Sequence, residues 1–137
     1  MKQKILPIKE KISQYLWQKP DGRKLRIGVG CAYLGKGEGD TLTEREHDLN
    51  VLQTTYEKGF RFYDTSADYQ GGRSEIILGE FFRQVPRDSV FIATKSNYEW
   101  RKPGDPFVKF QDNFLRSFEK LQVDHIDLFQ IHDTDHF

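Results

Sequence analysis

The segment FRFYDTSADYQGGRSEIILGEFF, residues 60–82, decides the fold of this 137-residue chain. Residues 60–64 form a short run rich in aromatic side chains, which is typical of a strand. A glycine-containing loop follows, and residues 74–84 carry apolar side chains at helical spacing. The segment therefore predicts one βα unit with a polar loop at the carboxyl end of its strand.

Both flanks repeat this alternation of strand and helix. Further strands are expected at 26–33, 89–95 and 126–131, and further helices at 43–59 and 105–121. Thr43 and Glu46 have the spacing of a capping box, and Asp105-Pro106 favours a helix start. Strands that alternate with such helices predict a parallel sheet built from βα units.

The N-terminal region has a different pattern. Residues 1–13 are polar and are expected to be loosely attached. Residues 14–27 predict a β-hairpin around Pro20-Asp21-Gly22, because proline and glycine favour its central turn positions. Residues 26–137 then supply four strands and three helices, and the whole chain is expected to form a single domain.

The composition excludes several classes of function. The 21 acidic residues balance 21 Lys and Arg, so no net charge attracts the chain to nucleic acid or to an anionic membrane. No segment reaches the apolar length that spans a bilayer, and the N-terminus lacks the apolar core of a signal peptide. Cys31 is the only cysteine, which excludes an intrachain disulfide and a zinc cluster of cysteines. We expect a cytoplasmic protein.

The glycines of GVGCAYLGKGEGD, residues 28–40, do not match a nucleotide-binding loop. Tyr33 stands where a dinucleotide fingerprint needs its third glycine, and Gly37 replaces the Ser or Thr of a P-loop. The next helix also begins too late to present its amides to a phosphate. A flexible loop over the mouth of a site is the preferred interpretation.

Polar residues end three of the predicted strands, and another lies in a loop. Asp64, Lys95 and His132 close their apolar runs, and Tyr69 lies five residues beyond Asp64. Because the carboxyl ends of parallel strands share one face, these four side chains could meet in one pocket. Each one alone has an ordinary explanation, as a turn cap or a surface residue. The segment HDTDH, residues 132–136, could also hold a metal ion, although it lacks a defined ligand spacing.

Together the four residues suit proton transfer. A free tyrosine has a pKa of about 10, which makes it a poor acid or base at neutral pH. A nearby ammonium favours the tyrosinate, a carboxylate keeps that ammonium charged, and a histidine can hydrogen-bond a substrate oxygen. This set suits hydride transfer at a carbonyl, in which a cofactor supplies the hydride.

The motifs GVGCAYLG, FRFYDTSADYQGGRSEIILGEFF, FIATKS and LQVDHIDLFQIHD resemble those of the aldo-keto reductases, over about residues 14–137. The resemblance implies that Tyr69 is the general acid/base, that Lys95 activates it, that Asp64 pairs with Lys95, and that His132 orients the substrate. It also implies that Gly30, Cys31 and Asp64 border the nicotinamide of NADP or NAD. The substrate would be a small carbonyl compound or a sugar, because DTSADYQGG and IHDTDHF look similar to the sugar-oxidising, L-galactose dehydrogenase-like branch.

The resemblance further implies the N-terminal half of a (β/α)₈ TIM barrel, with the hairpin closing the barrel bottom. The family's main cofactor-binding segments belong to later βα units, so we expect this chain alone to be inactive. The first and last strands would be open edges and barrel-facing Val, Ile and Phe would meet water, which favours self-association. The alternative is a non-catalytic half-barrel, either a pseudoenzyme or an interaction module of the kind that associates with potassium channels.

Overall fold

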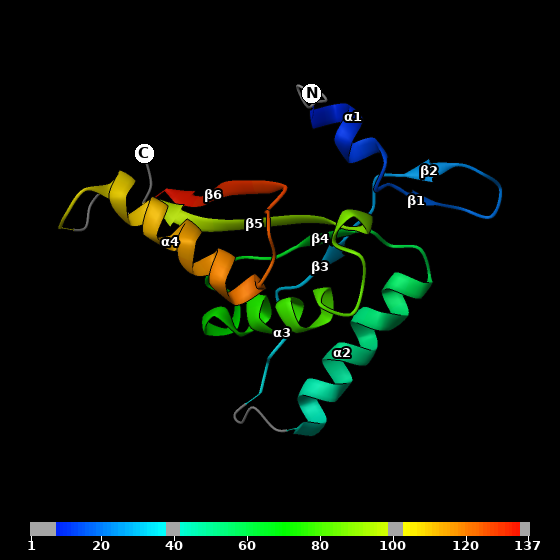
Figure 1. Ribbon diagram of the computed structural model, residues 1–137, viewed down its shortest axis with the longest axis horizontal. Helices are drawn as coiled ribbons and strands as arrows, with labels where there is room; N and C mark the ends of the chain where they lie inside the picture. The colour runs from blue at the N-terminus through cyan, green and yellow to red at the C-terminus, as the bar shows by residue number, and fades with distance from the viewer. Residues whose placement is uncertain (1–7, 38–41, 99–102, 135–137) are drawn as a thin grey trace.

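The computed structural model describes residues 8–37, 42–98 and 103–134 (Figure 1). Its elements in chain order are α1 (Ile8–Ser13), β1 (Trp17–Gln18), β2 (Lys24–Leu25), β3 (Val29–Gly30), α2 (Leu42–Glu57), β4 (Phe62–Asp64), α3 (Arg73–Phe82), β5 (Phe91–Tyr98), α4 (Pro106–Leu121) and β6 (Leu128–Thr134). Short 3-10 turns lie at Tyr69–Gly72 and Arg87–Ser89. The predicted hairpin, four strands and three helices are therefore all present.

The four strands that follow the hairpin form one parallel sheet in the order β3-β4-β5-β6. Gly30 pairs with Asp64, Asp64 with Ala93, and Ala93 with Leu128. The helices α2, α3 and α4 connect successive strands, and all three lie on one side of the sheet (Figure 1). This arrangement confirms the predicted fold class, part of a (β/α)₈ barrel, with the carboxyl ends of all four strands at one edge.

The core lies between the sheet and these helices. Its fully buried side chains include Tyr63 on β4, Ile92 on β5, and Leu78 and Phe81 on α3. Helix α3 approaches α4 closely at Gly79, where a Cβ atom would lie 2.4 Å from the carbonyl oxygen of Lys120. Every second residue of a strand, such as Tyr63 or Ile92, therefore faces the helices. The residues between them face the opposite side of the sheet, which is the inside of a complete barrel.

The helix ends follow the sequence signals with one exception. Asp105 caps α4, because its Oδ1 accepts the amide of Phe107 at 2.8 Å. Gly59, with φ of 90°, ends α2. The amides of Gly59 and Phe60 donate back to the carbonyls of the last helical turn, as in a Schellman motif. The prediction that Thr43 caps α2 is wrong, because the helix already begins at Leu42.

The N-terminal region is better ordered than we expected. The hairpin turns at Gly22 with φ of 86°, as predicted. The prediction of a loose N-terminus fails for residues 8–13, which form α1. This helix has partners on the sheet: Lys11 lies 5.9 Å from the centroid of the Phe91 ring, and its ammonium reaches Asp127.

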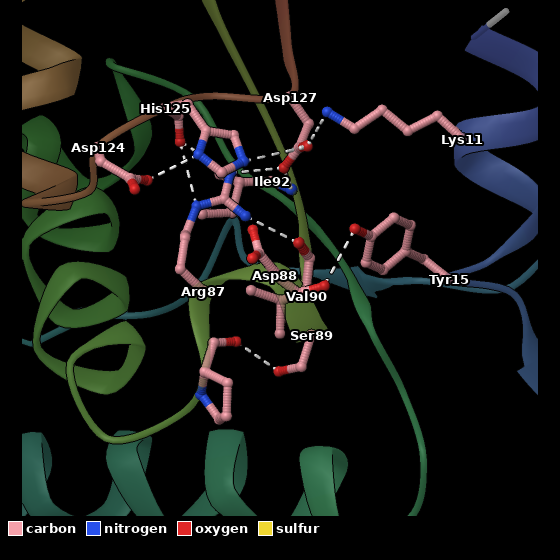
Figure 2. Close-up of polar contacts among 11 residues, drawn as sticks. Lys11, Tyr15, Arg87, Asp88, Ser89, Val90, Ile92, Asp124, His125 and Asp127 are labelled. Carbon is pink, nitrogen blue, oxygen red and sulfur yellow. Dashed lines mark hydrogen bonds and ion pairs between the residues drawn. The ribbon is translucent and has the colours of Figure 1, made fainter. Parts of the chain in front are cut away.

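Asp127 fastens α1 to the amino end of the sheet (Figure 2). Its side chain is fully buried, and Lys11 Nζ lies 2.6 Å from its Oδ1. Its Oδ2 accepts from Arg87 Nη2 at 2.6 Å and from the amide of Ile92 at 2.9 Å. Burial alone would raise the pKa of Asp127, but these three donors outweigh it and hold the pKa below its usual value.

The barrel-facing side of the sheet is covered at its amino end. Phe91 is fully buried there, with its ring stacked on that of Phe62 at a centroid distance of 4.9 Å and tilted against that of Tyr15 at 5.6 Å. The expectation that barrel-facing aromatics meet water is therefore wrong for Phe91, because α1 and the hairpin segment cover it. Ile27, which precedes β3, is 43% exposed as expected. None of the described helices is long and apolar enough to cross a membrane.

Candidate active site

Lys95 and Asp64 form an ion pair at the carboxyl ends of β5 and β4. Lys95 Nζ lies 2.5 Å from Asp64 Oδ1 and donates to the carbonyl oxygen of Thr65 at 2.7 Å. The strand register places both side chains on the same face, because Asp64 pairs with Ala93, two residues before Lys95. The lysine side chain is only 12% exposed, so the Asp64 carboxylate and the Thr65 carbonyl rather than water accept its hydrogen bonds.

Tyr69 and His132 lie beside this pair. Tyr69 begins the 3-10 turn after β4, and its ring centroid lies 5.1 Å from Lys95 Nζ. The ring of His132, on β6, meets the Tyr69 ring edge-on, with centroids 5.5 Å apart and planes at 88°. The structure thus brings together all four residues that the sequence singled out, from three strands and one loop.

The loop that carries Tyr69 is tied to its surroundings at both ends. Gln70 has φ of 52°, and its Nε2 donates to the carbonyl oxygen of Ala32 at 2.9 Å. The hydroxyls of Thr65 and Ser74 lie 2.8 Å apart, and Ser74 Oγ donates to the carbonyl oxygen of Cys31 at 2.7 Å. These contacts fix the loop against β3 and so place the tyrosine ring.

Glu75, on α3, connects that helix to β5 and α4, and no sequence signal marked it beyond its helical position. Its buried Oε1 accepts from Thr94 Oγ1 at 2.7 Å, next to Lys95 on β5. Lys120 Nζ on α4 lies 3.7 Å from its Oε2. Burial raises the pKa of Glu75 although Thr94, Ser117 and Lys120 oppose the rise.

Ser66 is a second residue that sequence reasoning missed. Its side chain is fully buried, and its Oγ lies 3.1 Å from both His132 Nδ1 and the carbonyl oxygen of Lys95. The amide of Asp68 donates to the same oxygen at 3.3 Å. No spacing rule marks a serine in this position, so only the folded loop reveals the contact with His132.

Gly30 and Cys31, which with Asp64 are expected to border the cofactor, differ in what they can offer. A Cβ atom on Gly30 would have no neighbour within 4 Å, so its backbone faces open space beside Asp64. A flat ring could approach the chain there without a clash. The thiol of Cys31 is buried in the core, and burial together with nearby Asp64 raises its pKa to about 12. Only the backbone of Cys31 could therefore border a cofactor on the open side.

The metal-binding interpretation receives no support within the described residues, where no group of three or more His, Cys, Asp and Glu could hold an ion. Asp135 and His136 of that segment lie outside the described residues. An apolar hollow of about 540 Å³ lies between α1 and the start of β3 and is bordered by Ile12, Ile27 and Phe62. A polar hollow of about 320 Å³ lies beside Asp68.

Comparison with known proteins gives the chain its relatives. The family model described as "Aldo/keto reductase family" matches residues 26–136. The probable aldo-keto reductase 1 of Glycine max is 30% identical over 115 residues, which cover 80% of this chain and 33% of that protein. L-galactose dehydrogenase of Arabidopsis thaliana is 30% identical over 113 residues, covering 80% of this chain and 34% of that protein. The chain thus spans about a third of the length of these relatives.

The solved structures agree on the fold. The crystal structure of the Bombyx mori aldo-keto reductase in complex with NADP superposes with a TM-score of 0.57 at 26% sequence identity. The match covers 85% of this chain and 36% of that one.

Proposed function

This chain belongs to the aldo/keto reductase family, and on that premise we propose that it is the acid–base part of an NAD(P)-dependent oxidoreductase. The reaction is hydride transfer between nicotinamide and the carbonyl or hydroxyl carbon of a small substrate. The observation that carries the proposal is the Lys95–Asp64 pair at 2.5 Å, with the Tyr69 ring 5.1 Å from the ammonium. An ammonium over the Tyr69 ring, 5.1 Å from its centroid, is close enough to stabilise a negative charge on the phenol oxygen of Tyr69.

In this mechanism Tyr69 exchanges one proton with the substrate oxygen. Lys95 stabilises the tyrosinate that is left when the proton has gone, and Asp64 keeps the ammonium charged and aimed. His132, whose ring contacts that of Tyr69 edge-on, hydrogen-bonds and orients the substrate. The nicotinamide, when bound, supplies or accepts the hydride.

The cofactor is NADP or NAD, and its nicotinamide end is proposed to lie against Gly30, the backbone of Cys31, and Asp64. The open space at Gly30 supports this placement, because a ring can approach the backbone there. The NADP complex of the Bombyx mori relative supports a nicotinamide cofactor of this kind. We place the remaining contacts, to the phosphates and adenine, on later βα units of a complete barrel.

The substrate class that we propose is an aldose or a similar hydroxyl-bearing compound. The similarity to L-galactose dehydrogenase supports this choice.

We place the protein in the cytoplasm, since its single cysteine, Cys31, is free and buried. Within the described residues β3 and β6 are the edge strands of the sheet, so the chain alone is proposed to self-associate through them.

Reconstitution of a complete barrel tests the proposal. The chain is joined to the matching C-terminal part of a relative, and aldose-dependent reduction of NAD or NADP is followed by absorbance. Tyr69→Phe should lower kcat by about 10²–10⁴-fold, the usual contribution of a general acid/base. Tyr15→Phe is the matched control, because it removes a phenol that donates to the Asp88 carbonyl at the opposite end of the strands. Unchanged turnover in Tyr69→Phe would exclude this role.

Cofactor titration of the 137-residue chain separates this proposal from a self-sufficient cofactor site. We expect no binding at micromolar NADPH or NADH, because the phosphate contacts are assigned to later units. Sedimentation of the same sample measures self-association. A chain that binds partners through its edges but gives no active reconstituted barrel would favour the non-catalytic alternative.

A further inference from the structure

The Ser66 hydroxyl is the only described group within hydrogen-bonding distance of either ring nitrogen of His132. It also contacts the carbonyl oxygen of Lys95 and the amide of Asp68. A hydroxyl has one proton to donate and two lone pairs that accept. The hydroxyl can therefore make all three hydrogen bonds only if it donates one and accepts two. The chemistry of each partner determines which bond is which.

The partners of Ser66 fix where the protons lie. The amide of Asp68 can only donate, so it occupies one lone pair, and the carbonyl of Lys95 can only accept, so it takes the hydroxyl proton. His132 Nδ1 is then left facing the second lone pair, and it completes the set only if it carries a proton. If Nδ1 were unprotonated, Ser66 would have to abandon the Lys95 carbonyl, and the cluster would contain one hydrogen bond fewer.

Asp68 favours the same arrangement. Its Oδ2 lies 3.9 Å from His132 Nδ1, so a proton on Nδ1 is attracted to the carboxylate. The ring tautomer in a protein is set by the hydrogen bond that the other nitrogen makes. With Nδ1 protonated, a neutral His132 has a lone pair on Nε2, and none of the described residues donates to that atom.

We propose that Ser66 is a positioning residue that holds His132 in its Nδ1–H tautomer, so that Nε2 of the neutral ring accepts a hydrogen bond from a second hydroxyl of the substrate, because the proton of the reacting hydroxyl passes to Tyr69. A substrate that carries a further hydroxyl beside the reacting carbon, such as a sugar, is recognised by this neutral ring. A carbonyl oxygen has no proton to give and needs the imidazolium. The tautomer stands on the geometry alone, whereas the substrate preference rests on the proposed function.

Nitrogen NMR of the 137-residue chain tests the tautomer without any activity. Long-range proton–nitrogen correlations distinguish protonated from unprotonated ring nitrogens at a pH where His132 is neutral, and His132→Gln assigns its signals. His125 is an internal reference, because its Nδ1 faces the acceptor Asp124 Oδ1 at 2.7 Å. We expect His132 to show a protonated Nδ1 and an unprotonated Nε2. A protonated Nε2 in the wild-type chain would overturn the proposal.

Variants separate a positioning role from a structural one. Ser66→Ala should shift the His132 signals toward the Nε2–H tautomer, and Asp68→Asn should shift them less. Ser89→Ala, which removes a hydroxyl bonded to the Pro86 carbonyl, should leave them unchanged. If Ser66→Ala does not fold, the wild-type spectrum and Asp68→Asn still decide. Ser66→Ala signals identical to the wild-type signals would refute the role of Ser66.

The substrate preference is measured in the reconstituted barrel. Ser66→Ala should raise KM for a substrate with this further hydroxyl by up to about tenfold, the value of one hydrogen bond, with a smaller effect on a substrate without it. Equal effects on both substrates would overturn the preference while leaving the tautomer intact. If the barrel is inactive with every substrate, the proposed function has failed, and the NMR result still stands.

Discussion

Replacing Asp127 with asparagine should destabilise the chain strongly, because this buried carboxylate joins α1, the start of β5 and Arg87. Its two oxygens face Lys11 Nζ at 2.6 Å, Arg87 Nη2 at 2.6 Å and the Ile92 amide at 2.9 Å. The side-chain amide of the variant would keep one acceptor and turn an N–H toward groups that are themselves donors. Two cations would then lose the charge that balances them.

The expected loss can be estimated from this geometry. Removing one partner of a buried ion pair costs about 3–5 kcal/mol, and Arg87 is the more buried of the two cations. Lys11 is 36% exposed and recovers water, so its bond adds little to the loss. With a urea m-value of about 2 kcal/mol/M, a loss of about 4 kcal/mol lowers the unfolding midpoint by about 2 M.

Urea denaturation followed by tryptophan fluorescence measures this loss. Asp124→Asn is the matched control, because Asp124 is 79% exposed and its side chain bonds only His125 among the contacts described. That variant should leave the unfolding midpoint close to the wild-type value. Lys11→Met should cost less than Asp127→Asn and add little on top of it. Equal midpoints for the Asp124 and Asp127 variants would refute the reasoning.

Three further outcomes follow from the described contacts. Burial raises the pKa of Glu75, so its ionisation opposes folding: the free energy of unfolding of the wild type should fall relative to Glu75→Gln as the pH rises above its ordinary value of 4.5, and parallel urea-derived pH profiles would contradict this. Gly79→Ala should cost about 1–3 kcal/mol in the same assay, since its Cβ meets the Lys120 carbonyl, whereas Gly30→Ala should be neutral because its Cβ meets nothing. Asp105→Ala should remove the α4 cap and about 1 kcal/mol, with a matching loss of protection at the first amides of α4 in hydrogen exchange.

The order of elements was predictable because it depends on short-range patterns. The alternation of apolar runs and amphipathic segments determined four strands and three helices, and Asp105 marked the start of α4 through a local hydrogen bond. Helix α1 was missed because its stability depends on Asp127, which is distant in the chain and reaches the helix only through the fold. No local pattern contains such a partner.

The residues of the candidate site likewise fall into those that a local pattern predicted and those that only the fold revealed. Asp64, Lys95 and His132 were found because each closes an apolar run, although β5 and β6 continue beyond Lys95 and His132 to Tyr98 and Thr134. Ser66 and Glu75 were missed because their roles depend on which side of a loop or helix is buried. Sequence reasoning also assigned Cys31 to the cofactor without indicating that its thiol faces the core.

The anchored loop that carries Tyr69 has a consequence for how such barrels diverge. Its hydrogen bonds to Ala32, Cys31 and β5 lie entirely within the four parallel strands and three connecting helices described above. The contacts that place the Tyr69 ring are therefore made without the segments proposed to bind the cofactor phosphates. Exchange between relatives of the later βα units, to which we assign the phosphate contacts, would alter nucleotide preference and leave the arrangement around Tyr69 unchanged. In that sense the junction after β6 is a natural point for recombination.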